Sequence, residues 1–271
     1  MVSIEQIHAW INDLAPFRYA EHWDNCGLQI GDAEAQTGGI LVALDPLQTV
    51  VEEARRLRCG CVVTHHPLIF KPLHSLRAEH FPDDIIIEFI RGKLNLIVAH
   101  TNLDSARGGT NDQLAHLLDI HGIEPLATEL AWRDEPSYGG MGRIGVLQKE
   151  CSLAELTARV RSALGGSVVK ASGDPHKMIK RVALCSGSGG TFLDAVIARE
   201  CDVFITGDVK YHDAQKAEAS GVGLIDAGHF ASEKLVVEPL AGRLREFAAK
   251  AGAEVQVYAS ETEKDPFWDI T

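Results

Sequence analysis

The chain has 271 residues, of which 45% are hydrophobic and 24% charged, a composition typical of a globular protein. Its length suits one large domain or two modest ones, and a chain of this size buries a core without disulfides. The 38 acidic residues against 26 basic ones give a formal net charge of -12. This charge favours solubility and repels a phosphate backbone at long range, so nucleic-acid binding is disfavoured unless a local basic patch exists.

The cysteines and the N-terminus point to one compartment. The six cysteines include no C-x-x-C pair, so we expect reduced thiols rather than a disulfide framework. Glu5 and Asp13 stand where a secretory signal would need a basic head and an apolar run. The apolar runs are too short to span a bilayer. We therefore expect a cytoplasmic protein with no membrane partner.

The first half of the chain alternates between helix and strand patterns. Ser3 and Gln6 form a capping-box pattern that opens a helix over 4–14, which Pro16 ends. The stretch HWDNCGLQIGD that follows is rich in turn formers and predicts a loop. The next apolar patterns predict strands and helices in alternation, at 39–44, 49–57, 61–64, 85–91, 94–99 and 111–118. This alternation predicts βαβ units and a largely parallel sheet covered on both faces.

A polar break at 129–138, with Trp132 and Pro136, precedes a second α/β region. Ser152 and Glu155 form another capping box at the start of its first helix. The strands predicted in this region lie at 142–147, 168–171, 181–185, 203–206, 223–226 and 254–259. Helices are expected at 152–164, at 192–199, after TGDVKYHDA, and in a long amphipathic stretch that ends near 250. The fold class is therefore α/β throughout.

Four of the strand patterns end in turns that carry metal-ligand side chains. In open α/β sheets, ligands bind just beyond the carboxyl ends of the strands. The turns are THHP at 64–67, HTNLD at 100–104, GDVKYHD at 207–213, and AGH at 227–229 with Glu233 following. Several such turns in one chain exceed what this composition produces by chance.

The spacing within these turns has a physical basis. His229 and Glu233 are four residues apart at the start of a helix, so both side chains lie on one face. His65 and His66 lie at the end of a strand, where a turn before a proline lets both reach one cluster. Asp104 can bridge two ions through its two oxygens. Imidazole and carboxylate ligands suit zinc, iron, manganese or a similar divalent ion, whereas an exposed helix face is the ordinary alternative for the His229 and Glu233 pair.

The loop Ser186-Gly187-Ser188-Gly189-Gly190 allows two interpretations. Its backbone amides could bind a phosphate at the start of the next helix. It is neither a Walker loop nor a dinucleotide-binding fingerprint, and the interpretation that we favour is a tight turn between a strand and a helix.

Motifs along almost the whole chain resemble the NIF-three-like family, also known as dinuclear metal centre proteins or type 2 homologues of GTP cyclohydrolase I. The matching stretches are WDNCGLQIGD at 23–32, THHPLIF at 64–70, AHTNLDSARGGTND at 99–112, SGSGG at 186–190, TGDVKYHDA at 206–214 and DAGHFASEK at 226–234. The resemblance implies two divalent metal ions per subunit, held by His65, His66, Asp104, His229 and Glu233.

The resemblance also implies an architecture. It consists of two similar α/β domains with mixed, largely parallel sheets, with the metals in the cleft between them, in a toroidal homohexamer. We expect residues 1–128 with 229–271 to form the first domain and residues 129–228 to form the second. The chain is too short for the inserted domain that some relatives carry.

The first functional hypothesis is a metal-dependent hydrolase, of the GTP cyclohydrolase kind, that acts on a nucleotide or another small cyclic C–N substrate. His100, Asp208, Tyr211 and His212 are the candidates for proton shuttles or for groups that orient the ligands. The second hypothesis is a non-catalytic metal-binding scaffold, metal chaperone or regulatory protein. A single or purely structural metal ion is a third interpretation.

Overall fold

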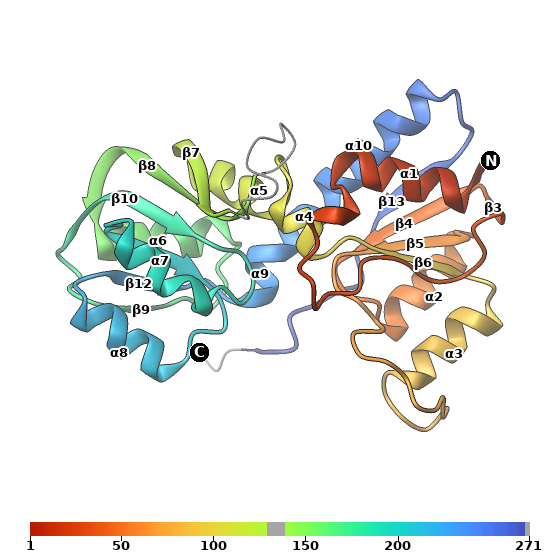
Figure 1. The fold of residues 1–271 in the computed structure, drawn as a ribbon, viewed down its shortest axis with the longest axis horizontal. Helices are drawn as coiled ribbons and strands as arrows, with labels where there is room; N and C mark the ends of the chain where they lie inside the picture. Colours follow the sequence, from red (N-terminus) through yellow and green to blue (C-terminus); the bar gives the residue numbers. More distant parts are fainter. Residues whose placement is uncertain (129–138, 269–271) are drawn as a thin grey trace. The chain divides into compact units, whose positions relative to one another are not determined.

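The computed structural model describes residues 1–128 and 139–268 (Figure 1). The polar break expected at 129–138 lies outside the described residues. The chain divides into two compact units. The first unit holds Met1–Leu103 and Val236–Lys264, and the second holds Asp104–Leu235 and the residues from Asp265 onwards. No helix of the described ranges is both long and apolar enough to cross a bilayer.

The positions at which the chain passes between the units differ from the expected ones. We placed them at 128/129 and 228/229, whereas the units exchange the chain at 103/104 and 235/236. Helix α5 (Thr110–Leu117) and strand β7 (Ile120–Ala127) follow the first of these positions. Leu114 of α5 and Ile120 of β7 are buried in a core of the second unit. The hydrophobic pattern identifies such residues as buried but not the core that buries them.

The first unit is built on a five-stranded sheet in the order β13-β4-β5-β6-β2. Four neighbouring strands are parallel, namely β13 (Gln256–Ala259), β4 (Gly39–Ala43), β5 (Cys61–Thr64) and β6 (Asn95–Val98). The fifth, β2 (Gly27–Ile30), pairs antiparallel with β6 along the edge. It lies in the stretch for which we expected only a loop, because turn-forming residues surround it and its partner strand is distant in sequence.

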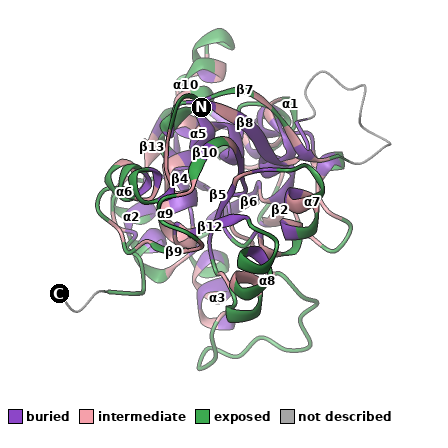
Figure 2. Cartoon of the chain, turned by 90° about the vertical axis from the view of Figure 1, so that its left-hand side faces the viewer, coloured by how far each residue is buried: buried purple, intermediate pink, exposed green. Residues whose placement is uncertain are grey.

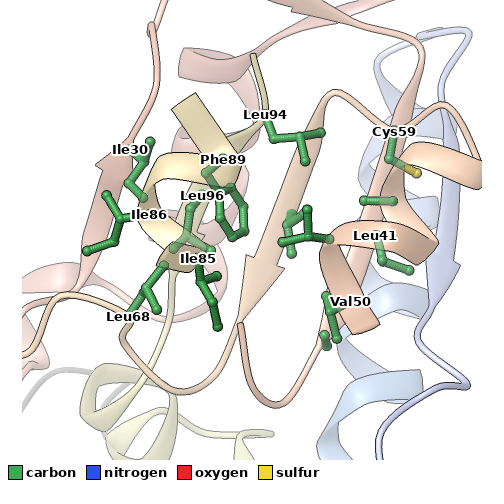
Figure 3. Close-up of a cluster of buried hydrophobic side chains, with 14 of the residues drawn as sticks. Ile30, Leu41, Val50, Cys59, Leu68, Ile85, Ile86, Phe89, Leu94 and Leu96 are labelled. Atoms are coloured by element: carbon green, nitrogen blue, oxygen red, sulfur yellow. The ribbon is translucent and has the colours of Figure 1, made fainter. Parts of the chain in front are cut away.

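Helices cover both faces of this sheet (Figure 1). On one face, α2 (Gln48–Arg56) and α3 (Asp83–Arg91) pack on strand side chains in the cluster of Figure 3, which includes Leu41, Val50, Ile86, Phe89 and Leu96. On the other face lie α1 (Ile4–Leu14) and α10 (Val237–Lys250). The Ser3 hydroxyl caps α1 by accepting a hydrogen bond from the Gln6 amide at 3.1 Å, as the capping pattern predicted.

The second unit is built on a six-stranded sheet in the order β7-β8-β10-β11-β12-β9. Its centre is parallel and consists of β10 (Met178–Leu184), β11 (Val203–Thr206) and β12 (Gly223–Asp226). Strands β8 (Met141–Ser152) and β9 (Lys170–Ser172) join this centre antiparallel, and β7 pairs antiparallel with β8. The predicted α/β class with mixed sheets and a two-unit layout is confirmed.

Successive strand residues of this sheet face opposite helix layers, as the strand period of two requires. Val182 and Leu184 belong to the core cluster that holds residues of α5 and α6 (Leu153–Ala163), whereas Ala183 belongs to the cluster with α7 (Leu193–Ala198) and α8 (Tyr211–Ala219). Figure 2 shows the result for the whole chain, because the strands are largely buried while the helices keep exposed outer faces.

Each unit contains the same kind of strand-to-helix connection. In each, the third parallel strand leads into a five-residue helix, β6 into α4 (Thr101–Ser105) and β12 into α9 (His229–Glu233). The chain passes from the first unit to the second inside α4, and it returns to the first just after α9. The helix that follows each passage, α5 or α10, therefore belongs to the unit that the chain has just entered. The motifs HTNLD and AGHFASE therefore lie at the two places where the chain passes from one unit to the other.

The core of the first unit is sensitive to loss of volume. Phe89 on α3 is fully buried, whereas its neighbour Ile90 is 55% exposed. We expect Phe89→Ala to lower the free energy of unfolding by about 3–5 kcal/mol, because the deletion leaves a cavity. The matched control Ile90→Ala should cost less than about 1 kcal/mol in denaturant unfolding. Equal losses for the two variants would contradict the packing described for this face.

Candidate metal centre

Each of the two adjacent histidines after β5 is oriented through its Nδ1 atom. His65 is buried, and its Nδ1–H donates to the carbonyl oxygen of Ala99 at 2.9 Å. The Nδ1 of His66 lies 2.7 Å from Oδ1 of Asp45. A carbonyl oxygen accepts and cannot donate, so the neutral His65 ring carries its hydrogen on Nδ1 and its lone pair on Nε2. Histidines that bind metals are oriented by this kind of contact.

His100, which follows β6, has the same arrangement. Its Nδ1 lies 3.0 Å from Oδ1 of Asp24, and the Thr101 amide donates to the other carboxylate oxygen at 3.1 Å. Burial opposes ionisation of Asp24, but the hydrogen bond and positive charge of His100, with the Thr101 hydroxyl, outweigh it and hold the pKa of this carboxyl well below its usual range. Asp24 is therefore a carboxylate at neutral pH, able to accept the ring N–H.

These three imidazoles form one cluster within the first unit. One nitrogen from each of His65, His66 and His100 lies within 4.8 Å of the other two. The ring of His65 is centred 5.1 Å from each of the other two rings. Imidazole nitrogens bind zinc, iron, copper and nickel well, so the donor set fits a divalent transition metal.

The second unit brings His229 and Glu233 together on α9. The Nε2 of His229 lies 2.9 Å from a carboxylate oxygen of Glu233, the contact expected from their spacing of four residues. The Nδ1 of His229 lies 2.7 Å from Oδ2 of Asp208. The Glu233 side chain is only 5% exposed. A carboxylate this deeply buried requires a compensating cation or hydrogen bonds, and an imidazole beside it makes the pair suitable for one ion.

Asp104 lies at the end of α4 and is fixed by the start of α5. It is buried, and the hydroxyl of Thr110 donates to its Oδ1 atom. The Asn111 side-chain amide donates to the Asp104 carbonyl at 3.1 Å, and its Oδ1 accepts from the amide of Ser186 at 2.9 Å. The carboxylate thus has a fixed position within the second unit.

The glycine-rich loop supports α9. The amide of Gly187 donates to the Ser232 hydroxyl at 3.0 Å, and the amide of Gly189 donates to the Thr206 hydroxyl at 2.8 Å. Together with the Ser186 amide, these donors are engaged by side chains of the protein. Of the two interpretations, the structure favours a tight turn over a phosphate cradle.

The four candidates for proton shuttles or orienting groups fall into two pairs. His100 and Asp208 contact the clusters, as described above. Tyr211 is 73% exposed at the start of α8. The Nδ1 of His212 lies 3.0 Å from Oε1 of Gln215, and the Gln215 amide donates to the Tyr211 hydroxyl at 3.4 Å. Tyr211 and His212 thus make these contacts along their own helix.

Sequence reasoning missed three carboxylates that hold the histidines in place, either directly or through a neighbouring turn. Asp24 and Asp45 accept from the rings, and Glu263 accepts from the amides of Leu44 and Asp45 at 2.8 and 2.7 Å, which fixes the turn that carries Asp45. Asp45 follows β4, so the rule about strand ends could have found it. Glu263 gave no signal, because it lies 218 residues from Asp45 in the chain.

The fold and the side-chain clusters together define a class of protein. Two α/β units with oriented histidines and buried carboxylates at the ends of parallel strands are typical of a metal-binding protein. The family model for DUF34/NIF3, described as NGG1p interacting factor 3, matches residues 2–266. The chain belongs to the DUF34/NIF3 family, as its motifs predicted.

Relatives and solved structures agree with this assignment. The chain is 34% identical to a "GTP cyclohydrolase 1 type 2 homolog" of Clostridium perfringens over 95% of each chain. It is 32% identical to a protein of the same name from Streptomyces coelicolor, over 98% of this chain and 94% of the relative. A crystal structure of a Staphylococcus aureus hypothetical protein, SA1388, matches with a TM-score of 0.91 and 31% identity over 99% of both chains.

The contact between His66 and Asp45 yields a test of the histidine orientation. Asp45→Asn removes the anionic acceptor but keeps the side-chain shape. We therefore expect zinc affinity to fall by about 10–100-fold, with the free energy of unfolding unchanged. The measurement is a competitive zinc titration against a chromophoric chelator. Asp13→Asn, at an exposed position of α1, is the control and should bind zinc like the wild type. Wild-type affinity in Asp45→Asn would contradict the role given to this carboxylate.

The position of Gly187 yields a second test. A Cβ added there would overlap Oε1 of Glu233 and lie 3.3 Å from Nε2 of His229, at a φ of +60°. We expect Gly187→Ala to displace the Glu233 carboxylate and to weaken zinc binding about tenfold or more. Gly122→Ala is the matched control, since Gly122 has the same φ with nothing within 4 Å. Both variants bear the backbone strain of about 1–2 kcal/mol, but only Gly187→Ala should lose metal.

Proposed function

We propose that the protein binds two divalent metal ions per subunit, held by His65, His66, Asp104, His229 and Glu233. The observation that carries this proposal is the orientation of the histidines. His65, His66 and His229 each have Nδ1 on an oxygen acceptor, which makes Nε2 the nitrogen through which each ring would bind a metal, and Nε2 of His229 lies 2.9 Å from the Glu233 carboxylate.

The connectivity of the chain places two of the proposed ligands close to the points where it passes between the units. Asp104 begins the second unit immediately after Leu103, and Glu233 lies three residues before Val236, where the chain returns to the first unit. Asp104, His229 and Glu233 therefore belong to the two crossing segments, whereas His65 and His66 follow β5 of the first unit. Zinc, iron and manganese all suit the mixture of imidazole and carboxylate donors.

We further propose that the site catalyses hydrolysis, in the manner of a GTP cyclohydrolase of the second type, on a nucleotide or another cyclic C–N substrate. The name carried by the relatives supports this direction. A pair of bound divalent ions lowers the pKa of water and polarises the bond under attack. In the cyclohydrolase version, one water would add to C8 of the guanine ring and the C8–N9 bond would break, and hydrolysis of the remaining C8–N7 bond by a second water would release C8 as formate.

The chain's own residues have distinct parts in this proposal. His100, with Nδ1 on the Asp24 carboxylate, is placed to accept or return a proton at Nε2. Asp208 holds the ring of His229 in orientation. Tyr211 and His212 are proposed to contact the substrate at the edge of the site. The family resemblance adds the expectation of a cytoplasmic homohexameric toroid, and the mass from light scattering tests the number of subunits.

The hydrolase predicts metal-dependent turnover. Protein loaded with zinc, manganese or iron should convert GTP into formate and a ring-opened or pterin product. Chromatography of the reaction mixture measures these products. Chelation should abolish the activity, and both His65→Ala and Glu233→Ala should lower kcat at least about 100-fold by removing a ligand. The control is Asp13→Asn, which should keep full activity.

Two results would contradict parts of this proposal. Turnover that persists in His65→Ala and Glu233→Ala would come from another protein. Two tightly bound ions without turnover on any nucleotide would remove the hydrolase and favour the non-catalytic scaffold or metal chaperone. One ion per chain after gentle purification would overturn the dinuclear site.

A further inference from the structure

Two large aromatic side chains are exposed beside the three-histidine cluster. Trp23 is 50% exposed and Phe70 is 45% exposed. Their rings are centred 5.8 Å apart at an interplanar angle of 58°. The indole of Trp23 also lies 6.3 Å from the ring of His100, at 74°. Both aromatic residues belong to loops of the first unit, one before β2 and one after β5.

Hydrogen bonds fix these two loops to each other. The side-chain amide of Asn25 donates to the carbonyl of Ile69 at 2.6 Å. The side-chain oxygen of Gln29 accepts from the amides of Leu68 and Ile69 at 3.1 and 2.9 Å. The residues next to Trp23 and Phe70 are thus held by polar contacts that leave the two rings outside the core.

The position of Trp23 relative to the histidines is fixed from the other side. Its neighbour Asp24 is bonded to the ring of His100 and to the amide of Thr101. Neither Phe70 nor His100 lies parallel to the indole, so neither covers its face with a stacked ring. A rigid, half-exposed indole costs little conformational entropy when a ligand binds on it.

We propose that Trp23 and Phe70 form a stacking platform that holds the planar heteroaromatic ring of the substrate beside His100. This inference rests on the proposed function of the same site and names the part of the substrate that the protein recognises. The half-exposed indole suits a flat ring, and the half-exposed Phe70 ring beside it adds a second aromatic surface. Stacking does not depend on charge, so it operates in a protein with a net charge of -12.

The test uses zinc-loaded full-length protein and guanosine, which provides the ring without the triphosphate. Calorimetric titration gives the dissociation constant for wild type, Trp23→Leu and Trp23→Phe. Base stacking on an aromatic side chain is worth about tenfold or more in affinity, so Trp23→Leu should raise the dissociation constant by about that factor. Trp23→Phe should restore most of the binding. Trp268→Leu, at a tryptophan that is 81% exposed, is the matched control and should bind guanosine like wild type.

Several outcomes would overturn the platform. They are wild-type protein that binds no guanosine, unchanged affinity in Trp23→Leu, or competition by ribose 5-phosphate as strong as that by guanosine. A change of oligomeric mass in Trp23→Leu with unchanged guanosine affinity would show that the rings contact another copy of the chain instead. Zinc content is measured for each variant, so loss of the metal is not mistaken for loss of stacking.

The same titration separates this inference from the hydrolase. Guanosine binding is measured without turnover. Guanosine binding that depends on Trp23, in a protein without activity on GTP, would support the platform and count against the hydrolase. Turnover of GTP with unchanged kcat and KM in Trp23→Leu would overturn the platform and leave the hydrolase.

Discussion

The hydrogen bond from an imidazole Nδ1 to an oxygen acceptor is the interaction on which the candidate metal centre depends. It fixes the tautomer of a ring and its direction, and it makes Nε2 the nitrogen through which the ring would bind a cation. The acceptors differ, since His65 uses the Ala99 carbonyl whereas His66, His100 and His229 use aspartates. Without them, each ring could rotate or carry its proton on the other nitrogen.

The fold supplies these acceptors because parallel strands end at the same edge of a sheet. Asp45 follows β4, His65 and His66 follow β5, and His100 follows β6, so three adjacent strands deliver one cluster. In the second unit, Asp208 follows β11 and His229 follows β12, which are also adjacent and parallel. The same geometry thus brings an aspartate to a histidine in both units.

Burial and close packing add constraints around the ligands. The side chain of Glu233 is almost completely enclosed, and the glycine-rich loop approaches it so closely that Gly187 leaves no room for a side chain. Burial raises the pKa of the neighbouring Cys185 thiol, and the charges of Asp104 and Glu233 raise it further, so this buried side chain is a neutral thiol beside the two carboxylates. In the first unit, Asp24 connects the histidine cluster to Trp23, because one residue orients His100 and adjoins the exposed indole.

The sequence by itself determined the α/β class, most helices and strands, and the family, and it predicted which residues would bind a metal. It did so because burial periodicity, capping residues and ligand-bearing turns are local in the chain. Only the tertiary structure decided that β2 is an edge strand, and that α5 and β7 pack in the second unit. It also decided that Asp24 and Asp45 contact the rings of His100 and His66, and that Glu263 fixes the turn of Asp45. These features depend on contacts between residues far apart in the chain, whose partners no local pattern identifies.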